Sequence, residues 1–334
     1  MTHLSKLAAE RSGAFKKDAR EEQFLDRMNE ALAPLDAEEY QDYPLEHPFF
    51  FVIGLPRSGT TFTTQFLAKA FGLSYVNNLA ARFYRAPLQG IRLAEATLGT
   101  SIEPSFDSNY ALTNNLGDIH EFGYFWRHWL YKGDLAAMER LQEDEARIDW
   151  AGLRRCLSTL QRHWDNASVF KNIFGSYHLS RLMEALEQKM MVVYIERDEL
   201  DTAVSIYKAR EKYYGAENLE KWWSYTPPEV NGLLDLDVYD QIAGQIHYLK
   251  AFYQNELGRL HQKNIIRLSY AELIQNPLSI AIKIKSQVQE AMNYYLNYKE
   301  DQLPSTFKQS KYQNEMELKK IFESRLAKFR RSVR

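Results

Sequence analysis

Four short hydrophobic runs, each bounded by polar or turn-forming residues, stand out along the chain. They lie at residues 47–54, 168–172, 190–196 and 264–270. Apolar runs of this length, without the alternation of a half-exposed strand, are typical of strands buried on both faces of a sheet. Each run therefore predicts a strand in the core of the protein.

Segments with the spacing of amphipathic helices separate these runs. One is YHLSRLMEALEQ at residues 177–188, and a longer one covers residues 238–262 and leads into the last run. Strands that alternate with helices predict a parallel sheet with helices on both faces. The expected fold class is α/β, a three-layer sandwich with a central parallel sheet. In such sheets, ligands bind beyond the carboxyl ends of the strands.

The sequence also indicates how the chain is divided into an extension and a domain. Residues 1–46 are charged and have a helical pattern, which predicts a helical extension in front of the core. Residues 47–334 are expected to form one domain, because no segment rich in Gly, Ser or Pro divides them. Neither a signal-peptide core nor an apolar run of about 18 residues is visible, so we expect no membrane span and a cytoplasmic protein.

Composition narrows the class of protein further. The 334 residues are 45% hydrophobic, which is enough for a sizeable core. The formal net charge of −2 does not favour nucleic acid as a partner. The single cysteine, Cys156, cannot form a disulfide within the chain, and this fits a reducing compartment.

The first predicted strand leads into the sequence GLPRSGTT at residues 54–61. Glycines allow the backbone to turn its N–H groups toward an anion, and the helix that follows adds the partial positive charge of its N-terminus. Arg57 can offer a charged fork to phosphate oxygens, and Thr60 and Thr61 can donate from their hydroxyl groups. The stretch predicts a P-loop-like nucleotide site.

This loop lacks two parts of an ordinary P-loop. Kinases and NTPases have a lysine after the second glycine, and Thr60 stands there in this chain. An apolar strand that ends in an obvious magnesium-binding aspartate is missing as well. Such a loop suits transfer of a sulfuryl group, which carries less negative charge than a phosphoryl group, and we expect no metal. A small-molecule kinase that uses Mg-ATP is the alternative.

A second motif, MMVVYIERDELDTAVSIYKAR at residues 190–210, places Arg197 just after the third strand. Asp198 is expected to cap the next helix, with Ser205 on a face away from the core. The predicted core stripe of this helix consists of Leu200, Val204 and Tyr207. Taken alone, the motif is better explained by a surface arginine and a helical serine than by a binding site.

Together the two motifs resemble those of the sulfotransferase family that uses 3′-phosphoadenosine 5′-phosphosulfate (PAPS). The family's 5′-phosphosulfate loop, P-[KR]-S-G-T-T, matches Pro56–Thr61. The residues that match its 3′-phosphate motif, R-D-x-x-D-x-x-x-S, are Arg197, Asp198, Asp201 and Ser205. The resemblance spans residues 48–290 and includes the segment RLSYAELIQNP at 267–277.

The resemblance implies an O-sulfotransferase that converts PAPS into 3′-phosphoadenosine 5′-phosphate (PAP). The acceptor would be a small molecule or a glycan. The residues implied for the 5′-phosphosulfate are Arg57, Ser58, Gly59, Thr60 and Thr61, and those for the 3′-phosphate are Arg197 and Ser205.

The family pattern breaks where a catalytic base is expected. Many cytosolic members carry Lys-Thr-His at this point, and here VFKNIFG retains Lys171 but has Ile173 in place of the histidine. The chain therefore resembles bacterial and glycan sulfotransferases more than the cytosolic ones. The C-terminal Arg-Lys-Gly segment of the cytosolic members is absent too. Lys308 or Lys311 is expected to lie near the nucleotide in its place.

The best source of a base is LGDIHEFGYFWRHWL at residues 116–130, which is expected to be helical. Its core stripe consists of Phe122, Phe125, Trp126, Trp129 and Leu130. Glu121, Tyr124 and His128 would share another side, and we expect Glu121 or the adjacent His120 to act as base. Two alternatives remain open: a solvated polar face, or a nucleotide-binding protein that has lost its base.

The segment KYYGAENLEKWWSYTPP at residues 212–228 is expected to form a loop or lid. Trp222, Trp223 and Tyr225 would line it, because flat rings suit stacking on sugars or aromatic acceptors. Adjacent tryptophans cannot face the same way on a helix, so at least one should reach a second surface. Core packing of these rings is the alternative.

Overall fold

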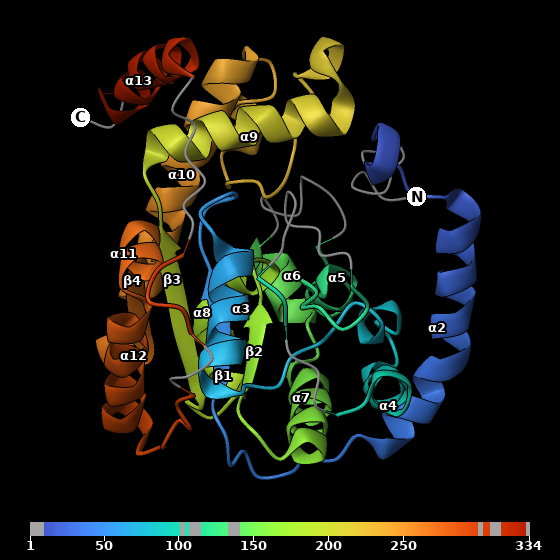
Figure 1. Cartoon of the computed structure of the whole chain (residues 1–334). Helices are drawn as coiled ribbons and strands as arrows, with labels where there is room; N and C mark the ends of the chain where they lie inside the picture. The colour runs from blue at the N-terminus through green and yellow to red at the C-terminus, as the bar shows by residue number, and fades with distance from the viewer. Residues whose placement is uncertain are drawn as a thin grey trace.

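A central four-stranded parallel sheet organises the computed structural model, which describes residues 10–100, 104–106, 115–132, 141–299, 303–307 and 315–331. The strands are β1 (Phe49–Ile53), β2 (Ser168–Lys171), β3 (Met190–Glu196) and β4 (Ile265–Ser269). Their order in the sheet is β2-β1-β3-β4, so β1 lies between β2 and β3 (Figure 1). All four strands predicted from the hydrophobic runs are confirmed.

Both faces of the sheet are buried, which explains the continuous hydrophobic runs. Successive residues of a strand point to opposite faces. Phe50 and Val52 of β1 belong to one core cluster, and Phe49, Phe51 and Ile53 belong to another. All five are fully buried. The central strand therefore has an apolar side chain at every position.

Helices cover both faces and complete the predicted three layers (Figure 1). One face of the sheet, to which Phe50 points, is covered by α3 (Thr60–Phe71), α11 (Tyr270–Gln275) and α12 (Pro277–Met292). The core on the other face includes α4 (Pro87–Leu98), α5 (Gly123–Leu130), α7 (Trp150–Trp164), α8 (Leu179–Ala185), α9 (Glu199–Tyr214), α10 (Val238–Gly258) and α13 (Met316–Arg331). The short helix α6 (Leu141–Arg147) precedes α7.

Short 3₁₀ helices connect several of these elements. They are η1 (Gly13–Phe15), η2 (Ala80–Arg82), η4 (Phe174–His178), η5 (Ala216–Asn218), η6 (Val230–Gly232) and η7 (Gln262–Asn264). The helix predicted over residues 238–262 ends at Gly258, because the chain tightens into η7 before it enters β4. Above the carboxyl ends of the strands, α9 crosses the molecule with α13 packed against it (Figure 1).

Buried polar side chains attach the N-terminal helix α2 (Ala19–Glu39) to the rest of the protein. The carboxylate of Asp36 accepts hydrogen bonds from the backbone N–H groups of Leu88 and Gln89 at 3.1 and 3.0 Å. The side chain of Asn29 donates to the carbonyl of Arg82 at 2.8 Å. The division into an extension over residues 1–46 and a domain over 47–334 stays a prediction.

The helix predicted over residues 116–130 is wrong in its first half. Helix α5 begins only at Gly123, after Phe122 adopts a left-handed backbone conformation with φ 54°. Before this point the chain pairs with residues 76–78, where His120 N–H donates to the Val76 carbonyl. Backbone pairing with a distant segment overrides the local helical pattern. The core stripe predicted for residues 116–130 is nevertheless buried, except for the partly buried Trp129.

The segment at residues 212–228 is a loop from Gly215 onward, as predicted, but both tryptophans lie in the core, which is the alternative to a lid. Trp222 and Trp223 are 3% and 8% exposed. The guanidinium group of Arg210 lies 5.3 Å from the centre of the Trp222 ring. The side-chain amide of Gln245 on α10 donates to the backbone carbonyl of Trp223 at 3.1 Å. This segment is part of the scaffold.

Over the part of the chain that the structure describes, no helix combines the length and the hydrophobicity needed to cross a membrane. Lys308 and Lys311, which the sequence suggested near the nucleotide, lie outside the described residues.

Candidate active site

The turn that follows β1, at residues 54–59, can only be built with glycine at two positions. Gly59 has φ 103°, and a Cβ atom there would lie 2.5 Å from the ring of Tyr270. A Cβ atom on Gly54 would lie 2.6 Å from the carbonyl oxygen of Ile195 in β3. The left-handed conformation and the two close approaches explain why this loop contains both glycines.

Hydroxyl groups surround the start of α3, directly after this turn. Thr60 and Thr61 are buried in its first turn, and Ser58 is 1% exposed. The Ser58 Oγ atom has no hydrogen-bond partner in the described part of the chain. The first N–H groups of any α-helix also lack partners within the helix. An anion at this position would satisfy these donors, so the site fits a phosphate or sulfate group.

The two predicted halves of the nucleotide site meet in space. The Arg57 Nε atom donates to Ser205 Oγ on α9 at 3.0 Å. Arg197, which follows β3, donates from Nη1 to the Arg57 carbonyl at 3.3 Å. Ser205 is fully buried, and Arg57 has a left-handed backbone with φ 69°. The loop after β1 and the motif after β3 therefore form one site with two arginines.

The helix after β3 begins as the sequence predicts. Asp198 caps α9, with its carboxylate accepting from the Asp201 N–H at 2.9 Å. The cap fixes the point where β3 turns into α9, and thereby the position of Arg197. Val204 is buried in the core, and Leu200 and Tyr207 pack against it, as predicted.

Tyr270, at the end of β4, is a site residue that the sequence reasoning missed. The Arg197 guanidinium lies 4.9 Å from the centre of its ring, within the range of a cation–π contact. The same ring fills the space beside Gly59. The segment 267–277, which resembles part of the sulfotransferase pattern, contains Tyr270 and could have indicated it.

A partly buried ion pair lies at the end of β2, with the Glu121 side chain 29% exposed. Lys171 donates from Nζ to Glu121 Oε2 at 3.0 Å, and the lysine side chain is only 7% exposed. The other carboxylate oxygen, Oε1, is buried and has no hydrogen-bond partner among the residues described. One oxygen of Glu121 is thus bound by the lysine, while the other can still accept a proton.

His120 is neutral, and unlike Glu121 it has its acceptor atom already engaged in a hydrogen bond. Its Nδ1 atom accepts a hydrogen bond from the Phe122 N–H at 2.8 Å. The residue is exposed at the surface, and the protein around its ring, together with the charge of Lys171, lowers the pKa of His120. An imidazole that is neutral and accepts at Nδ1 carries its proton on Nε2. This arrangement favours Glu121 over His120 as the proton acceptor.

Tyr124 and His128 bond to neither residue of this pair in the described part of the chain. The Tyr124 hydroxyl bonds to Lys17 and to Glu22 of the N-terminal region. His128 is exposed, and partial burial together with Arg85 lowers its pKa. Of the titratable groups in residues 116–130, Glu121 is the one that contacts Lys171.

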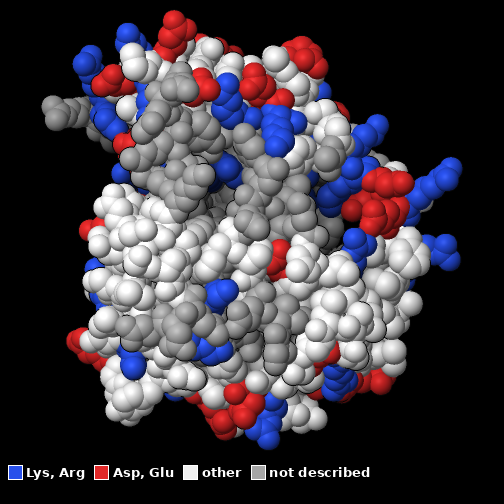
Figure 2. All heavy atoms as spheres, in the orientation of Figure 1, with Lys and Arg blue, Asp and Glu red and all other residues white. Residues whose placement is uncertain are grey.

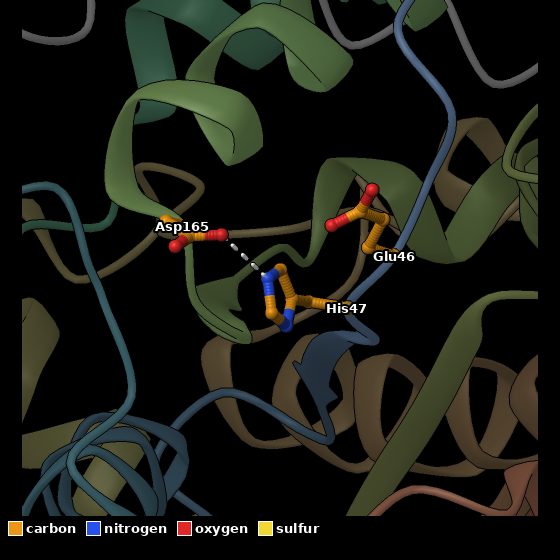
Figure 3. A group of neighbouring side chains, drawn as sticks. All are labelled: Glu46, His47 and Asp165. Carbon is orange, nitrogen blue, oxygen red and sulfur yellow. Dashed lines mark hydrogen bonds and ion pairs between the residues drawn. The ribbon is translucent and has the colours of Figure 1, made fainter.

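A second group of titratable side chains, Glu46, His47 and Asp165, lies just before the starts of β1 and β2 (Figure 3). His47 precedes β1, and its Nε2 atom is 3.2 Å from Asp165 Oδ1. Its Nδ1 atom is 3.0 Å from the Tyr294 hydroxyl. The side chains of Glu46, His47 and Asp165 have the spacing of metal ligands, with ligand atoms within 4.8 Å of one another. They lie at the amino ends of the strands, away from the loop after β1.

Comparisons with known proteins concern the family and the fold of the chain. A model described as "Sulfotransferase family" matches residues 48–291, which include every residue from Arg57 to Tyr270 discussed above. No curated protein matches the chain.

Solved structures of similar fold are bacterial sulfotransferases. Sulfotransferase STF9 from Mycobacterium avium has a TM-score of 0.51 and 13% identity, covering 93% of this chain and 86% of that chain. STF1 from Mycobacterium tuberculosis H37Rv has a TM-score of 0.45 and 14% identity, with coverages of 89% and 81%. The sulfotransferase domain from the curacin biosynthetic pathway has a TM-score of 0.41 and 14% identity, with coverages of 86% and 91%. At 13% identity, the STF9 structure supports a fold shared with this chain and nothing about its substrates.

Proposed function

The chain belongs to the sulfotransferase family, and from this premise we propose that it transfers a sulfuryl group from PAPS to the hydroxyl group of an acceptor. The observation that carries the proposal is the contact of Arg57 with both Ser205 and Arg197. A donor with phosphate groups on both its 5′ and 3′ sides needs two adjoining anion-binding segments. A nucleotide with phosphates on its 5′ side alone would leave Arg197 and Ser205 without a role.

Within this proposal, the donor is held from two sides. Ser58, Thr60 and Thr61 donate to the 5′-phosphosulfate, together with the first N–H groups of α3. Arg197 and Ser205 bind the 3′-phosphate. The buried Ser58 Oγ atom, which has no partner within the described chain, supports the fit of an oxyanion here.

The remaining residues serve the transfer itself. The acceptor oxygen forms a new bond to sulfur while the bond between sulfur and the 5′-phosphate oxygen breaks. Glu121 takes the proton of the acceptor hydroxyl at Oε1. Lys171 and Arg57 stabilise the negative charge that builds up on the departing 5′-phosphate. The products are the sulfated acceptor and PAP.

We propose that the acceptor is a small molecule or a glycan and that nucleic acid is not a partner. On the face in Figure 2, Lys and Arg are intermixed with Asp and Glu, and much of the described surface in the middle is uncharged. A field of positive charge, which would attract a polyanion, is not visible among the described residues of this face.

A screen with labelled PAPS and pooled hydroxyl compounds tests the proposal. Label should appear in at least one acceptor as PAP is released. A matched protein with Arg57→Ala should release far less PAP. If the wild-type protein binds PAP but labels no acceptor in pools of phenols, alcohols and glycans, it is a nucleotide-binding protein that has lost transferase activity.

A further inference from the structure

The segment that leads into β1 is tied to the end of α7 by one buried side chain. Gln161, in the last turn of α7, is 2% exposed. Its Oε1 atom accepts hydrogen bonds from the backbone N–H groups of Glu46 and His47 at 3.1 and 3.2 Å. Its Nε2 atom donates to the His47 carbonyl at 2.6 Å. These three hydrogen bonds hold the backbone of residues 46–47 against α7 and so fix where the Glu46 and His47 side chains begin.

Asp165 brings a second carboxylate to the same place. It is the C-cap of α7, and its N–H donates to the Gln161 carbonyl at 2.8 Å. Its backbone is left-handed, with φ 48°, a conformation that aspartate adopts more readily than most residues. The carboxyl end of a helix carries a partial negative charge, which disfavours a carboxylate and favours a cation. Asp165 therefore lies where a positive charge would be stabilised from two sources.

The side chains of Glu46, His47 and Asp165 converge (Figure 3). In the view of Figure 3, the His47 ring lies between the two carboxylates. Two ligand atoms that bind one Zn²⁺ ion at tetrahedral angles are about 3.3–3.6 Å apart. The distance of 3.2 Å from His47 Nε2 to Asp165 Oδ1 is close to this value. Glu46, with its ligand atom within 4.8 Å of the other two, is exposed and can approach by rotating its side chain.

The second ring nitrogen of His47 is placed as in a metal-binding histidine. A metal binds the ring nitrogen without a proton, and the proton then lies on the other nitrogen. The Nδ1 atom of His47 is 3.0 Å from the Tyr294 hydroxyl, which can accept that proton's hydrogen bond. Such a partner fixes the orientation and tautomer of a histidine ligand. A simple hydrogen bond from Nε2 to Asp165 is the alternative, and it would leave Glu46 without a role.

A hollow of about 130 Å³ opens at these side chains. All three line it, together with Gln161 and Arg162. A water molecule occupies about 30 Å³ in the liquid, so the hollow has room for an ion and for waters that complete its coordination. Arg162 is the one lining residue with a fixed positive charge, and it forms no ion pair with either carboxylate in the described chain. Negative charge is therefore in surplus around the hollow.

We propose that Glu46, His47 and Asp165 bind a divalent transition-metal ion, and that zinc is the ion that fits them. An imidazole nitrogen with two carboxylate oxygens suits zinc, whereas Mg²⁺ and Ca²⁺ prefer oxygen ligands alone. The ion joins the segment before β1 to the end of α7, just before β2, and so stabilises the fold. It takes no part in sulfuryl transfer, because the length of β1 separates these residues from the loop at 54–61. The proposal is independent of the proposed function.

Calorimetry with zinc chloride tests the site on the full chain, purified without a histidine tag and freed of metal by a chelator. The proteins are the wild type, Glu46→Gln, Asp165→Asn and the control Glu95→Gln. Glu95 lies 2.8 Å from His163 in a pair of partly exposed side chains, which no third ligand completes in the described chain. The wild type and Glu95→Gln should bind zinc with the same affinity. The affinity should fall at least about tenfold in Glu46→Gln and in Asp165→Asn, because each loses a ligand.

Several outcomes of the calorimetry would overturn the proposal. One is equal zinc affinity in all four proteins, and another is the absence of zinc binding by the wild type. Binding of Mg²⁺ as tight as that of zinc would also overturn it, because the imidazole would then not be a ligand. Arg162→Gln should leave the zinc affinity unchanged or raise it, since a positive charge opposes a cation. A tenfold loss in this variant would contradict a cation site.

Thermal stability gives a second readout. Zinc should raise the melting temperature of the wild type and of Glu95→Gln until the site is saturated, and the rise should be smaller in His47→Gln. The melting temperature of each metal-free protein separates the lost ligand from the lost contact with Tyr294. PAP affinity should be the same with zinc and with a chelator. An equal rise for His47→Gln and the wild type would mean that zinc binds elsewhere in the chain, and the proposal would fail.

Discussion

The ammonium group of Lys171 and the carboxylate of Glu121 form a hydrogen bond of 3.0 Å between the end of β2 and the residues just before α5. Lys171 binds Oε2 of the carboxylate, and Oε1 is buried without a partner among the described residues. The pair therefore holds one carboxylate in a fixed position while one of its oxygens remains able to accept a proton. In the proposed reaction, this oxygen receives the proton of the acceptor.

Replacing the carboxylate tests this role. Glu121→Gln, a near-isosteric change, should lower kcat by at least about tenfold, because general bases contribute about 10²–10⁴-fold. PAP affinity should stay unchanged, since Glu121 is not among the proposed donor-binding residues. Steady-state release of PAP and calorimetry with PAP measure the two quantities.

His120→Ala is the matched comparison and should have the smaller effect on kcat. Its Nδ1 atom already accepts from the Phe122 N–H, so the side chain has less capacity to take up a proton. If both variants turn over at the wild-type rate on a true acceptor, the base lies in another segment, and His128 is the next residue to replace.

Arg197→Ala tests the assignment of the 3′-phosphate. The change should weaken PAP by about 1.5–3 kcal/mol, the usual value of a hydrogen bond to a charged group. It should barely affect adenosine 5′-phosphosulfate, which lacks the 3′-phosphate. Calorimetry with both ligands gives the comparison. Equal losses for the two would mean that Arg197 acts by supporting the loop at the Arg57 carbonyl.

Gly59→Ala should destabilise the protein and weaken PAP binding. The position combines φ 103° with a Cβ that would lie 2.5 Å from Tyr270. We expect a loss of at least about 1–3 kcal/mol in the free energy of unfolding, as for other strained backbone positions. Denaturant unfolding and PAP calorimetry measure the two effects.

The matched control for this change is Gly99→Ala. Gly99 also has a positive φ, 85°, but none of the described residues lies within 4 Å of the position of its Cβ. It should lose stability through backbone strain alone and keep its PAP affinity. If Gly59→Ala behaves like Gly99→Ala in both measurements, the contact between the loop and Tyr270 does not matter for the site.

The loop, its strand and the second motif could be predicted because their signals are local. Four apolar runs mark the strands, and the paired glycines and Asp198 mark the turn and the helix cap. The Lys171–Glu121 pair and the contact between His47 and Asp165 could not be predicted, because each contact joins segments far apart in the chain. The sequence could not decide between a lid and core packing for Trp222 and Trp223, because adjacent aromatic rings give no sign of what covers them.

His178, on η4, predicts how stability depends on pH. Its side chain is fully buried, and its Nε2 atom has no partner in the described chain, so burial lowers its pKa to about 3. Glu145, 2.9 Å from Nδ1, favours the charged ring, but the buried Nε2 would carry an unsolvated proton. We therefore expect the folded protein to keep the ring neutral well below the ordinary pKa of about 6.5.

The unfolded chain binds a proton at this histidine below about pH 6.5, and the folded chain does not until about pH 3. Stability should therefore fall as the pH drops from 6.5, by up to about 1.4 kcal/mol per pH unit from this residue. Urea unfolding between pH 7 and 5 should show a shallower fall for His178→Gln than for the wild type. Parallel curves would mean that other groups cause the acid sensitivity.

Calorimetry with PAP and with ATP, each with and without Mg²⁺, tests the central claim most directly. Thr60 stands where a kinase loop has its lysine, and Arg197 and Ser205 meet Arg57 on the side proposed for a 3′-phosphate. The account predicts that PAP binds more tightly than ATP and needs no Mg²⁺. Tighter binding of ATP that depends on Mg²⁺ would contradict it and would favour a kinase.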